Sequence, residues 1–218
     1  NGSVQMNKMV EIRLWNARNG GYILVFFHLI GLFLLGSDWR EDFVFLTPYN
    51  LLLLLAVYLM ASERPRNVFL YVTPVFLGFL IEVIGTNTNW PFGEYSYGAA
   101  LGPMLFQTPL MIGVLWWVLV RAWFDVAGRW TRNKWAKSLI TGTAMVLMDV
   151  LIEPVAIELG FWVWAEQQVP MSNYIAWFIL ATLFARITAS GDASNKQSVW
   201  VISVLTAFFA ALNIAFTF

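Results

Sequence analysis

Seven long apolar stretches follow one another along the chain, and mostly short polar links separate them. A helix that crosses a bilayer needs about 20 mostly apolar residues, because a rise of ~1.5 Å per residue has to cover ~30 Å of hydrocarbon. The pattern therefore predicts seven transmembrane helices. They are expected at about residues 20–36, 43–61, 68–85, 101–123, 138–159, 173–188 and 199–216. Because the links are short, neighbouring helices are expected to pack antiparallel.

The predicted fold class is all-α, a polytopic membrane helix bundle. No link is long enough to separate a second domain, so residues 6–218 are expected to form one transmembrane domain. Residues 1–5 precede Met6 and resemble a cloning scar, and we leave them out of the fold.

The positive charges predict how the bundle is oriented. When the seven helices alternate in direction, Arg40 alone among the 13 Lys and Arg side chains falls on one side of the membrane. Lys and Arg gather on the cytoplasmic side of membrane proteins, so the N-terminus is predicted to be cytoplasmic and the C-terminus outside. The residues assigned to the cytoplasmic side are Lys8, Arg13, Arg18, Arg64, Arg66, Arg121, Arg129, Arg132, Lys134, Lys137, Arg186 and Lys196.

Composition agrees with a membrane protein and narrows the chemistry. Hydrophobic residues make up 59% of the chain and charged residues 12%, against about 25% charged in soluble domains. A net charge of zero gives no reason to expect a nucleic-acid partner. The absence of Cys excludes disulfides, thiolate catalysis and iron–sulfur clusters, and a single His excludes His-rich metal sites. No Lys lies within a predicted span to hold retinal, and no glycine-rich phosphate loop is visible. We therefore expect no cofactor and no metal.

Three acidic residues interrupt the apolar pattern. Glu82 lies near the outer end of the third span, and Asp149 and Glu153 lie in the outer half of the fifth, four residues apart on one helix face. Two carboxyl groups on one face in a low dielectric do not both ionise readily. Pro154 follows and favours a break in the helix there. Ionisable groups inside a membrane are costly and usually functional, although interhelical hydrogen bonds are an alternative reason for them.

The predicted outer loops are unusually aromatic. Residues 86–102 contain Trp90, Phe92, Tyr95 and Tyr97 with several glycines, and Glu94 is the one charged residue among them. Residues 160–174 repeat this character with Trp162 and Trp164 among others. An aromatic belt at the membrane surface is one explanation, but it does not account for the polar, glycine-rich segments between the rings. We therefore favour a lid over a cavity.

Further polar residues are predicted in the same outer half. Asn50 falls in the second span, Gln107 in the fourth, and Asn173 at the start of the sixth. His28 lies in the middle of the first span, where a hydrogen-bonded contact between helices is more common than a catalyst. We keep His28 as a weaker candidate for the substrate-binding set.

The segment from Glu82 to Tyr97 resembles a motif of a known family. It reads EVIGTNTNWPFGEYSY and is similar to the E-x-x-G…G-x-x-F-G-x-Y-x-Y segment of the membrane carotenoid-biosynthesis family that includes carotenoid 1,2-hydratases. Two later stretches resemble the same family: Asp149 to Val155 with the GFWVW that follows, and the P-x-x-N-x-x-x-W that ends at Trp177. Asn89 and Ala176 stand where the family has Gly.

The resemblance implies cofactor-free addition of water to the terminal double bond of an acyclic carotenoid, which gives a tertiary alcohol. This chemistry needs a desolvated acid, a base for the attacking water and aromatic faces near a cation. We expect Asp149 and Glu153 to divide the acid and base roles, with Glu82 as the alternative acid or the group that orients water. The residues expected to bind water or substrate are Asn87, Trp90, Phe92, Glu94, Tyr95, Tyr97, Gln107, Trp162, Trp164, Asn173 and His28.

Other functions stay open at this point. A carotenoid cyclase would use the same acid but quench the cation internally, so its product would not gain the mass of water. A proton-coupled transporter usually shows paired repeats, which this chain lacks. A carotenoid-binding protein would not need three buried acids. The expected partners are a hydrophobic carotenoid and membrane lipid, with contacts to other carotenoid-pathway enzymes left open. The expected location is the plasma (inner) membrane of a prokaryote, because no organelle signal is visible.

Overall fold

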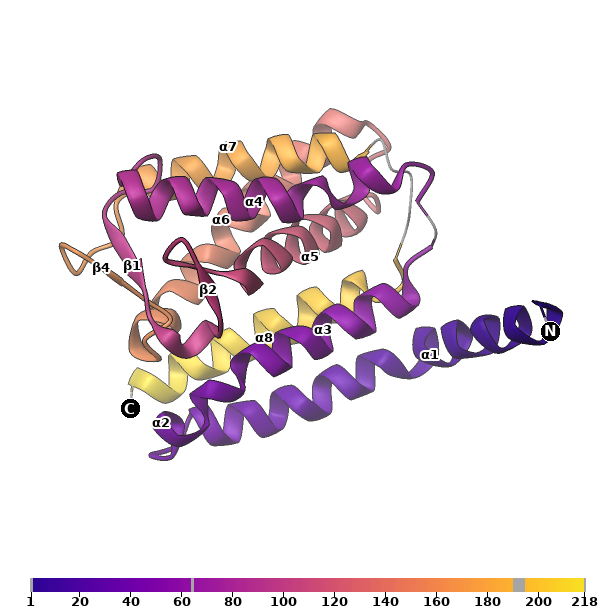
Figure 1. The fold of residues 1–218 in the computed structure, drawn as a ribbon, viewed down its shortest axis with the longest axis horizontal. Helices are drawn as coiled ribbons and strands as arrows, with labels where there is room; N and C mark the ends of the chain where they lie inside the picture. The colour runs from indigo at the N-terminus through magenta and orange to yellow at the C-terminus, as the bar shows by residue number, and fades with distance from the viewer. Residues whose placement is uncertain (1, 64, 190–194, 218) are drawn as a thin grey trace.

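The computed structural model describes residues 2–63, 65–189 and 195–217 and confirms an all-α bundle (Figure 1). Within these ranges, seven helical segments are long and apolar enough to cross a membrane. They are α1 (Gly2–Leu35, apolar from Arg18), α2 (Arg40–Phe43) continued through the 3₁₀ turn η1 (Val44–Leu46) into α3 (Thr47–Ala61), α4 (Val68–Thr88), α5 (Leu110–Ala127), α6 (Lys134–Glu158), α7 (Met171–Thr188) and α8 (Ser198–Thr217).

The helices form two groups that meet along α5, α6 and α8. Helices α4, α5, α6 and α7 pack on one another, and α1, α3 and α8 make a second group against α5 and α6 (Figure 1). The helices differ accordingly in how much of them is buried. In the apolar stretch of α5, 67% of the residues are buried, against 28% in those of α1 and α8. Helix α5 therefore lies at the centre of the bundle, and the outer helices present large apolar side chains to the surface that lipid would cover.

The fourth span begins later than the sequence predicts. Residues 102–109 are not helical: the 3₁₀ turn η2 (Ala99–Leu101) leads into a hairpin of β2 (Met104–Leu105) and β3 (Thr108–Pro109), and α5 starts at Leu110. Gly102, Phe106 and Gln107 have positive φ, a conformation that ends regular helix. Gln107 consequently lies in an exposed turn, and not within a span as we expected.

A two-stranded ribbon joins the two aromatic loops. Strand β1 (Tyr95–Tyr97), between α4 and α5, pairs antiparallel with β4 (Trp162–Trp164), between α6 and α7. Tyr95 lies opposite Trp164, and Tyr97 opposite Trp162. Successive side chains of a strand point to opposite faces, so these four rings share one face, while Ser96 and Val163 are exposed on the other. The ribbon was not predicted, because three-residue strands leave no periodicity to detect.

A buried polar cluster around Arg121 lies at the end of the bundle opposite the β1–β4 ribbon and has a structural role. Arg121, 1% exposed, forms an ion pair with Asp125 at 3.0 Å. Ser198 donates to the same carboxylate at 2.8 Å, and the guanidinium of Arg121 lies over the ring of Tyr71. These contacts join α5 to α8 and α4, and they stabilise the charge of Arg121, which would be costly if it were buried without a partner.

Helices α4 and α5 approach each other closely at Gly113, and this contact gives a test of the packing. A Cβ at Gly113 would overlap the carbonyl oxygen of Val75 and come within 3.0 Å of Phe79. Gly113→Ala is therefore expected to lower stability by about 1–3 kcal/mol through overpacking. Gly31→Ala is the matched control, because its Cβ would make ordinary contact with Phe208 at 3.4 Å. Thermal unfolding of both variants in detergent measures the effect, and equal melting temperatures would refute the close contact.

Candidate active site

The three membrane acids predicted from the sequence meet around one small cavity. Glu82 comes from α4, and Asp149 and Glu153 come from one face of α6, which runs through Pro154 without ending. All three side chains are 3% exposed or less. The cavity between them has a volume of about 20 Å³, enough for one water molecule. The residues that line it are Glu82, Phe92, Tyr95, Tyr97, Ile112, Leu115, Asp149, Ile152, Glu153, Trp162, Trp164, Asn173 and Trp177.

Glu82 accepts three hydrogen bonds. Tyr95 and Tyr97 each donate a phenolic hydrogen to its Oε2, at 2.6 and 2.7 Å, and the indole of Trp116 donates to Oε1 at 2.8 Å. The pKa of each tyrosine lies well above the usual value for a phenol, mainly because the side chain is buried and secondarily because the Glu82 carboxylate is adjacent. The phenols therefore keep their hydrogens and remain donors. Both carboxylate oxygens of Glu82 are therefore occupied by protein donors.

Glu153 and Asp149 are held differently. Trp162 and Trp164 both donate to Oε2 of Glu153, each at 2.9 Å. From the described part of the chain, Asp149 accepts a single hydrogen bond, from Asn173 to Oδ2 at 2.7 Å. Its Oδ1 is buried and has no hydrogen-bond partner among the described residues. Counted over residues 2–63, 65–189 and 195–217, donors to carboxyl oxygens thus number three for Glu82, two for Glu153 and one for Asp149.

The β1–β4 ribbon accounts for this division of donors. Because side chains alternate along a strand, two rings of each strand point toward the acids. The tyrosines of β1 donate hydrogen bonds to Glu82, and the tryptophans of β4 donate to Glu153. The rings of Tyr95 and Trp164 also pack on each other with centroids 5.1 Å apart. The aromatic loops are therefore a lid whose hydrogen-bond donors point inward, and this arrangement supports the lid over a simple aromatic belt.

A larger apolar cavity adjoins the acids. It has a volume of about 330 Å³ and lies between α1, α3, α5, α6 and α8. Leu115, Ile152 and Trp162 line both cavities, so the two cavities adjoin at these residues. Phe27 and Ile30 of α1 and Tyr49 of α3 line the larger cavity and are 41–66% exposed, so it opens between α1 and α3 toward the lipid-facing surface.

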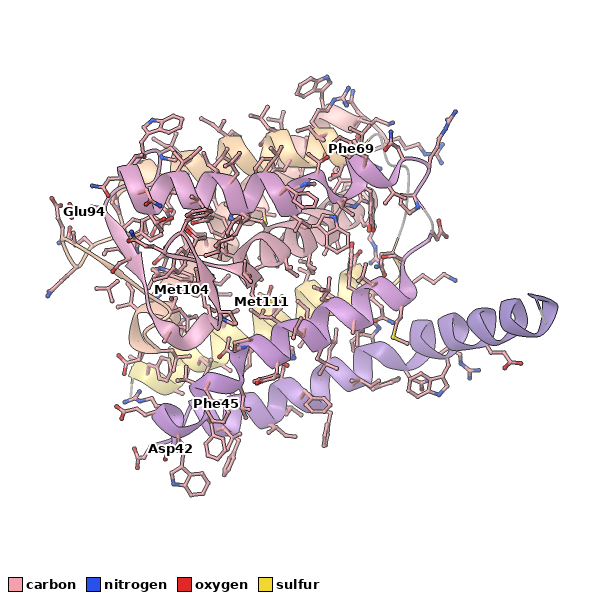
Figure 2. The ribbon with its side chains drawn as sticks, viewed as in Figure 1. Asp42, Phe45, Phe69, Glu94, Met104 and Met111 are labelled. Atoms are coloured by element: carbon pink, nitrogen blue, oxygen red, sulfur yellow. The ribbon has the colours of Figure 1, made fainter. Side chains whose placement is uncertain are left out.

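Several predicted site residues lie outside the acid cavity. Asn87 and Trp90 are exposed, and Asn87 donates to the carbonyl oxygens of Val83 and Phe106. Glu94 is exposed and lies at the outer edge of the molecule (Figure 2). Gln107 is exposed in the β2–β3 turn, and His28 lines the larger cavity. The structure thus brings together Phe92, Tyr95, Tyr97, Trp162, Trp164 and Asn173 with the three acids.

Sequence reasoning missed Ile112, Leu115, Ile152 and Trp177, which line the acid cavity. It also missed Trp116, which contacts Glu82. Trp116 lies in the apolar run of α5, is 1% exposed, and donates to Glu82 while stacking on Trp177 with centroids 4.4 Å apart. A Trp inside a transmembrane run looks like any other apolar residue, so no sequence signal separates it. Among the described residues, no group of three acidic or His side chains has the arrangement of a metal site.

The departure at Asn89 from the family motif has a structural explanation. Asn89 follows the last residue of α4 with φ of 62°, in the left-handed region, and its backbone N–H donates to the carbonyl oxygen of Gly85 at 2.8 Å. Glycine adopts this conformation most easily, and Asn tolerates it better than other residues. Asn89 can therefore serve as the C-cap that Gly provides in the motif.

Comparison with known proteins agrees with the resemblance in sequence. A bisanhydrobacterioruberin hydratase from Haloarcula japonica is 35% identical over 107 residues, which cover 45% of this chain and 36% of the relative. The aligned part is thus about a third of that relative's length. No solved structure matches the chain. The family model for carotenoid biosynthesis proteins matches residues 45–218, more than three quarters of the chain. The protein is therefore a member of the carotenoid biosynthesis protein family.

Proposed function

We propose that this protein is a carotenoid hydratase that adds water across the terminal double bond of an acyclic carotenoid end group. The observation that supports this most directly is the pairing of cavities. A space for one water among three carboxyl groups shares three lining residues with an apolar cavity that opens toward lipid. The polyene would lie in the apolar cavity, its alkene end would reach past the shared residues to the acids, and the water would lie beside the acids.

Asp149 is proposed as the general acid. Hydrogen bonds to a carboxylate favour its ionised form, and Asp149 receives the fewest of the three. Its Oδ1 is buried without a described partner, so a proton on that atom has no competing donor aimed at it. In the reaction, the Oδ1–H bond breaks and the proton bonds to the less substituted alkene carbon, using the π electron pair. The positive charge then forms on the tertiary carbon.

Glu153 is proposed as the general base, and Glu82 as a fixed negative charge near the cation. Both described donors to Glu153 bond to Oε2, which leaves Oε1 to accept a proton from water. As the water oxygen bonds to the tertiary carbon, one of its protons passes to Glu153, and the product is a tertiary alcohol. Return of this proton to Asp149, one helical turn away, restores the starting state. The rings of Trp162 and Trp164 add apolar and π surface around the cation.

The reaction itself is the direct test. Purified protein in liposomes is incubated with an acyclic carotenoid such as lycopene in ¹⁸O-labelled water, without nucleotide or metal. We expect a product that has gained the mass of one labelled water, located on its terminal tertiary carbon. A product of unchanged mass with a ring would identify a cyclase and refute the hydratase. The control is Glu166→Gln, which changes an exposed carboxyl group in the β4–α7 loop and should retain activity.

A further inference from the structure

A pair of polar side chains lies in the wall of the large apolar cavity, away from the acids. His28 of α1 is 5% exposed, and its ring packs edge-on against Phe208 with centroids 5.2 Å apart. Asn50 of α3 faces it across the cavity wall, with Nδ2 3.4 Å from Nε2 of His28. Nearly all the other lining residues are apolar. A polar pair in such a wall costs free energy unless its hydrogen-bonding groups are satisfied.

The hydrogen bonds fix how this pair is oriented. His28 Nδ1 lies 2.8 Å from the carbonyl oxygen of Leu24, which can only accept, so Nδ1 carries the hydrogen. In the uncharged imidazole, Nε2 is then an acceptor, and the Asn50 atom that faces it must be the NH₂ group. Asn50 Oδ1 therefore points elsewhere. It is buried and has no hydrogen-bond partner among the described residues.

From this geometry we infer that the apolar cavity binds an isoprenoid chain that carries a hydroxyl group, and that the hydroxyl donates to Asn50 Oδ1. The missing partner is a donor, because Asn50 Oδ1 can only accept. A hydroxyl supplies that donor, whereas a hydrocarbon, an ether or a ketone does not. His28 is a positioning residue, because its Nε2 holds the Asn50 amide in the orientation that presents Oδ1. This inference deepens the proposed function, on which it rests for the nature of the chain.

Acyclic prenyl alcohols are suitable probes, because each has a dimethyl-substituted alkene at one end and a hydroxyl at the other. Geraniol, farnesol and geranylgeraniol vary the separation of the two groups. Each is compared with the hydrocarbon in which hydrogen replaces the hydroxyl, and with its methyl ether. Binding is measured as displacement of a bound carotenoid from the purified protein in detergent. The Asn50→Leu variant provides the reference that cancels differences in partition into the micelle.

We expect one chain length to bind wild-type protein about tenfold more tightly as the alcohol than as the hydrocarbon, in line with the cost of a buried group left unpaired. In Asn50→Leu this ratio should fall to about one, with hydrocarbon binding retained. His28→Leu should reduce the ratio partly. The methyl ether should bind no better than the hydrocarbon.

Binding and turnover separate this inference from the proposed function. The same alcohol preference in wild type and Asn50→Leu, or no preference at any chain length, would overturn the hydroxyl site even if lycopene is hydrated. A preference that disappears in Asn50→Leu would support the hydroxyl site even if no substrate gains water, and in that case the hydratase would be the proposal that fails. Retained hydrocarbon binding shows that Asn50→Leu is folded.

Discussion

Asp149→Asn is expected to lower the rate of carotenoid hydration by roughly a thousandfold, the typical contribution of a general acid. Asn matches the shape of Asp and can still accept from Asn173, so the surrounding helices should keep their packing. What disappears is the proton that the alkene needs. The measurement is the initial rate of ¹⁸O incorporation into lycopene by purified protein in liposomes.

Two further variants make this result specific. Glu153→Gln should also slow the reaction strongly, because the attacking water would lose its base while Trp162 and Trp164 retain an acceptor in the amide oxygen. Glu166→Gln, an exposed acid-to-amide change, should leave the rate unchanged. Full activity in Asp149→Asn at an unchanged melting temperature would remove Asp149 from the mechanism and with it the proposed order of proton transfers.

Glu82→Leu is expected to produce the largest loss of stability, about 3 kcal/mol or more. The change removes the acceptor of three hydrogen bonds. Their donors, which are the hydroxyls of Tyr95 and Tyr97 and the indole N–H of Trp116, lose this acceptor. Each buried donor left unpaired costs about 1–3 kcal/mol. The melting temperature in detergent should fall by several degrees, and Glu82→Gln, which keeps an acceptor oxygen, should lie between Leu and wild type.

The matched control for this prediction is Glu166→Leu, because Glu166 is exposed in the lid. Its melting temperature should change little. If Glu82→Leu proved as stable as wild type, the three donors would have other acceptors, and the hydrogen bonds to Glu82 would not be what stabilises the lid.

The sequence predicts the helices and the acids well, because both leave strong local signals. Apolar runs of membrane length have few alternatives, and a carboxyl group inside such a run stands out. The spacing of Asp149 and Glu153 is enough by itself to place them on one helix face. The approach of Glu82 to that face is not written in any local pattern, because it depends on how α4 packs against its neighbours.

The errors in prediction have a common physical origin. The predicted start of the fourth span is nine residues early, at residue 101 in place of Leu110, because Leu101, Met104, Leu105 and Phe106 extend the apolar run toward the preceding loop. Hydropathy does not report the positive φ angles of Phe106 and Gln107. Asn87, at the end of α4, and Trp90, in the turn that follows, lie close to Tyr95 in the sequence, but composition cannot show which of these side chains turn inward.

The antiparallel register of β1 and β4 couples Glu82 and Glu153, which are far apart in the chain. Shifting one strand by a single residue would exchange its inward and outward faces. Such a slip in β1 would expose Tyr95 and Tyr97 and strip Glu82 of two donors, and a slip in β4 would do the same to Glu153. The pairing of β1 with β4 therefore determines how many hydrogen bonds Glu82 and Glu153 receive. Mutations that weaken this pairing should change proton transfer by the acids under conditions in which the helix bundle is still folded.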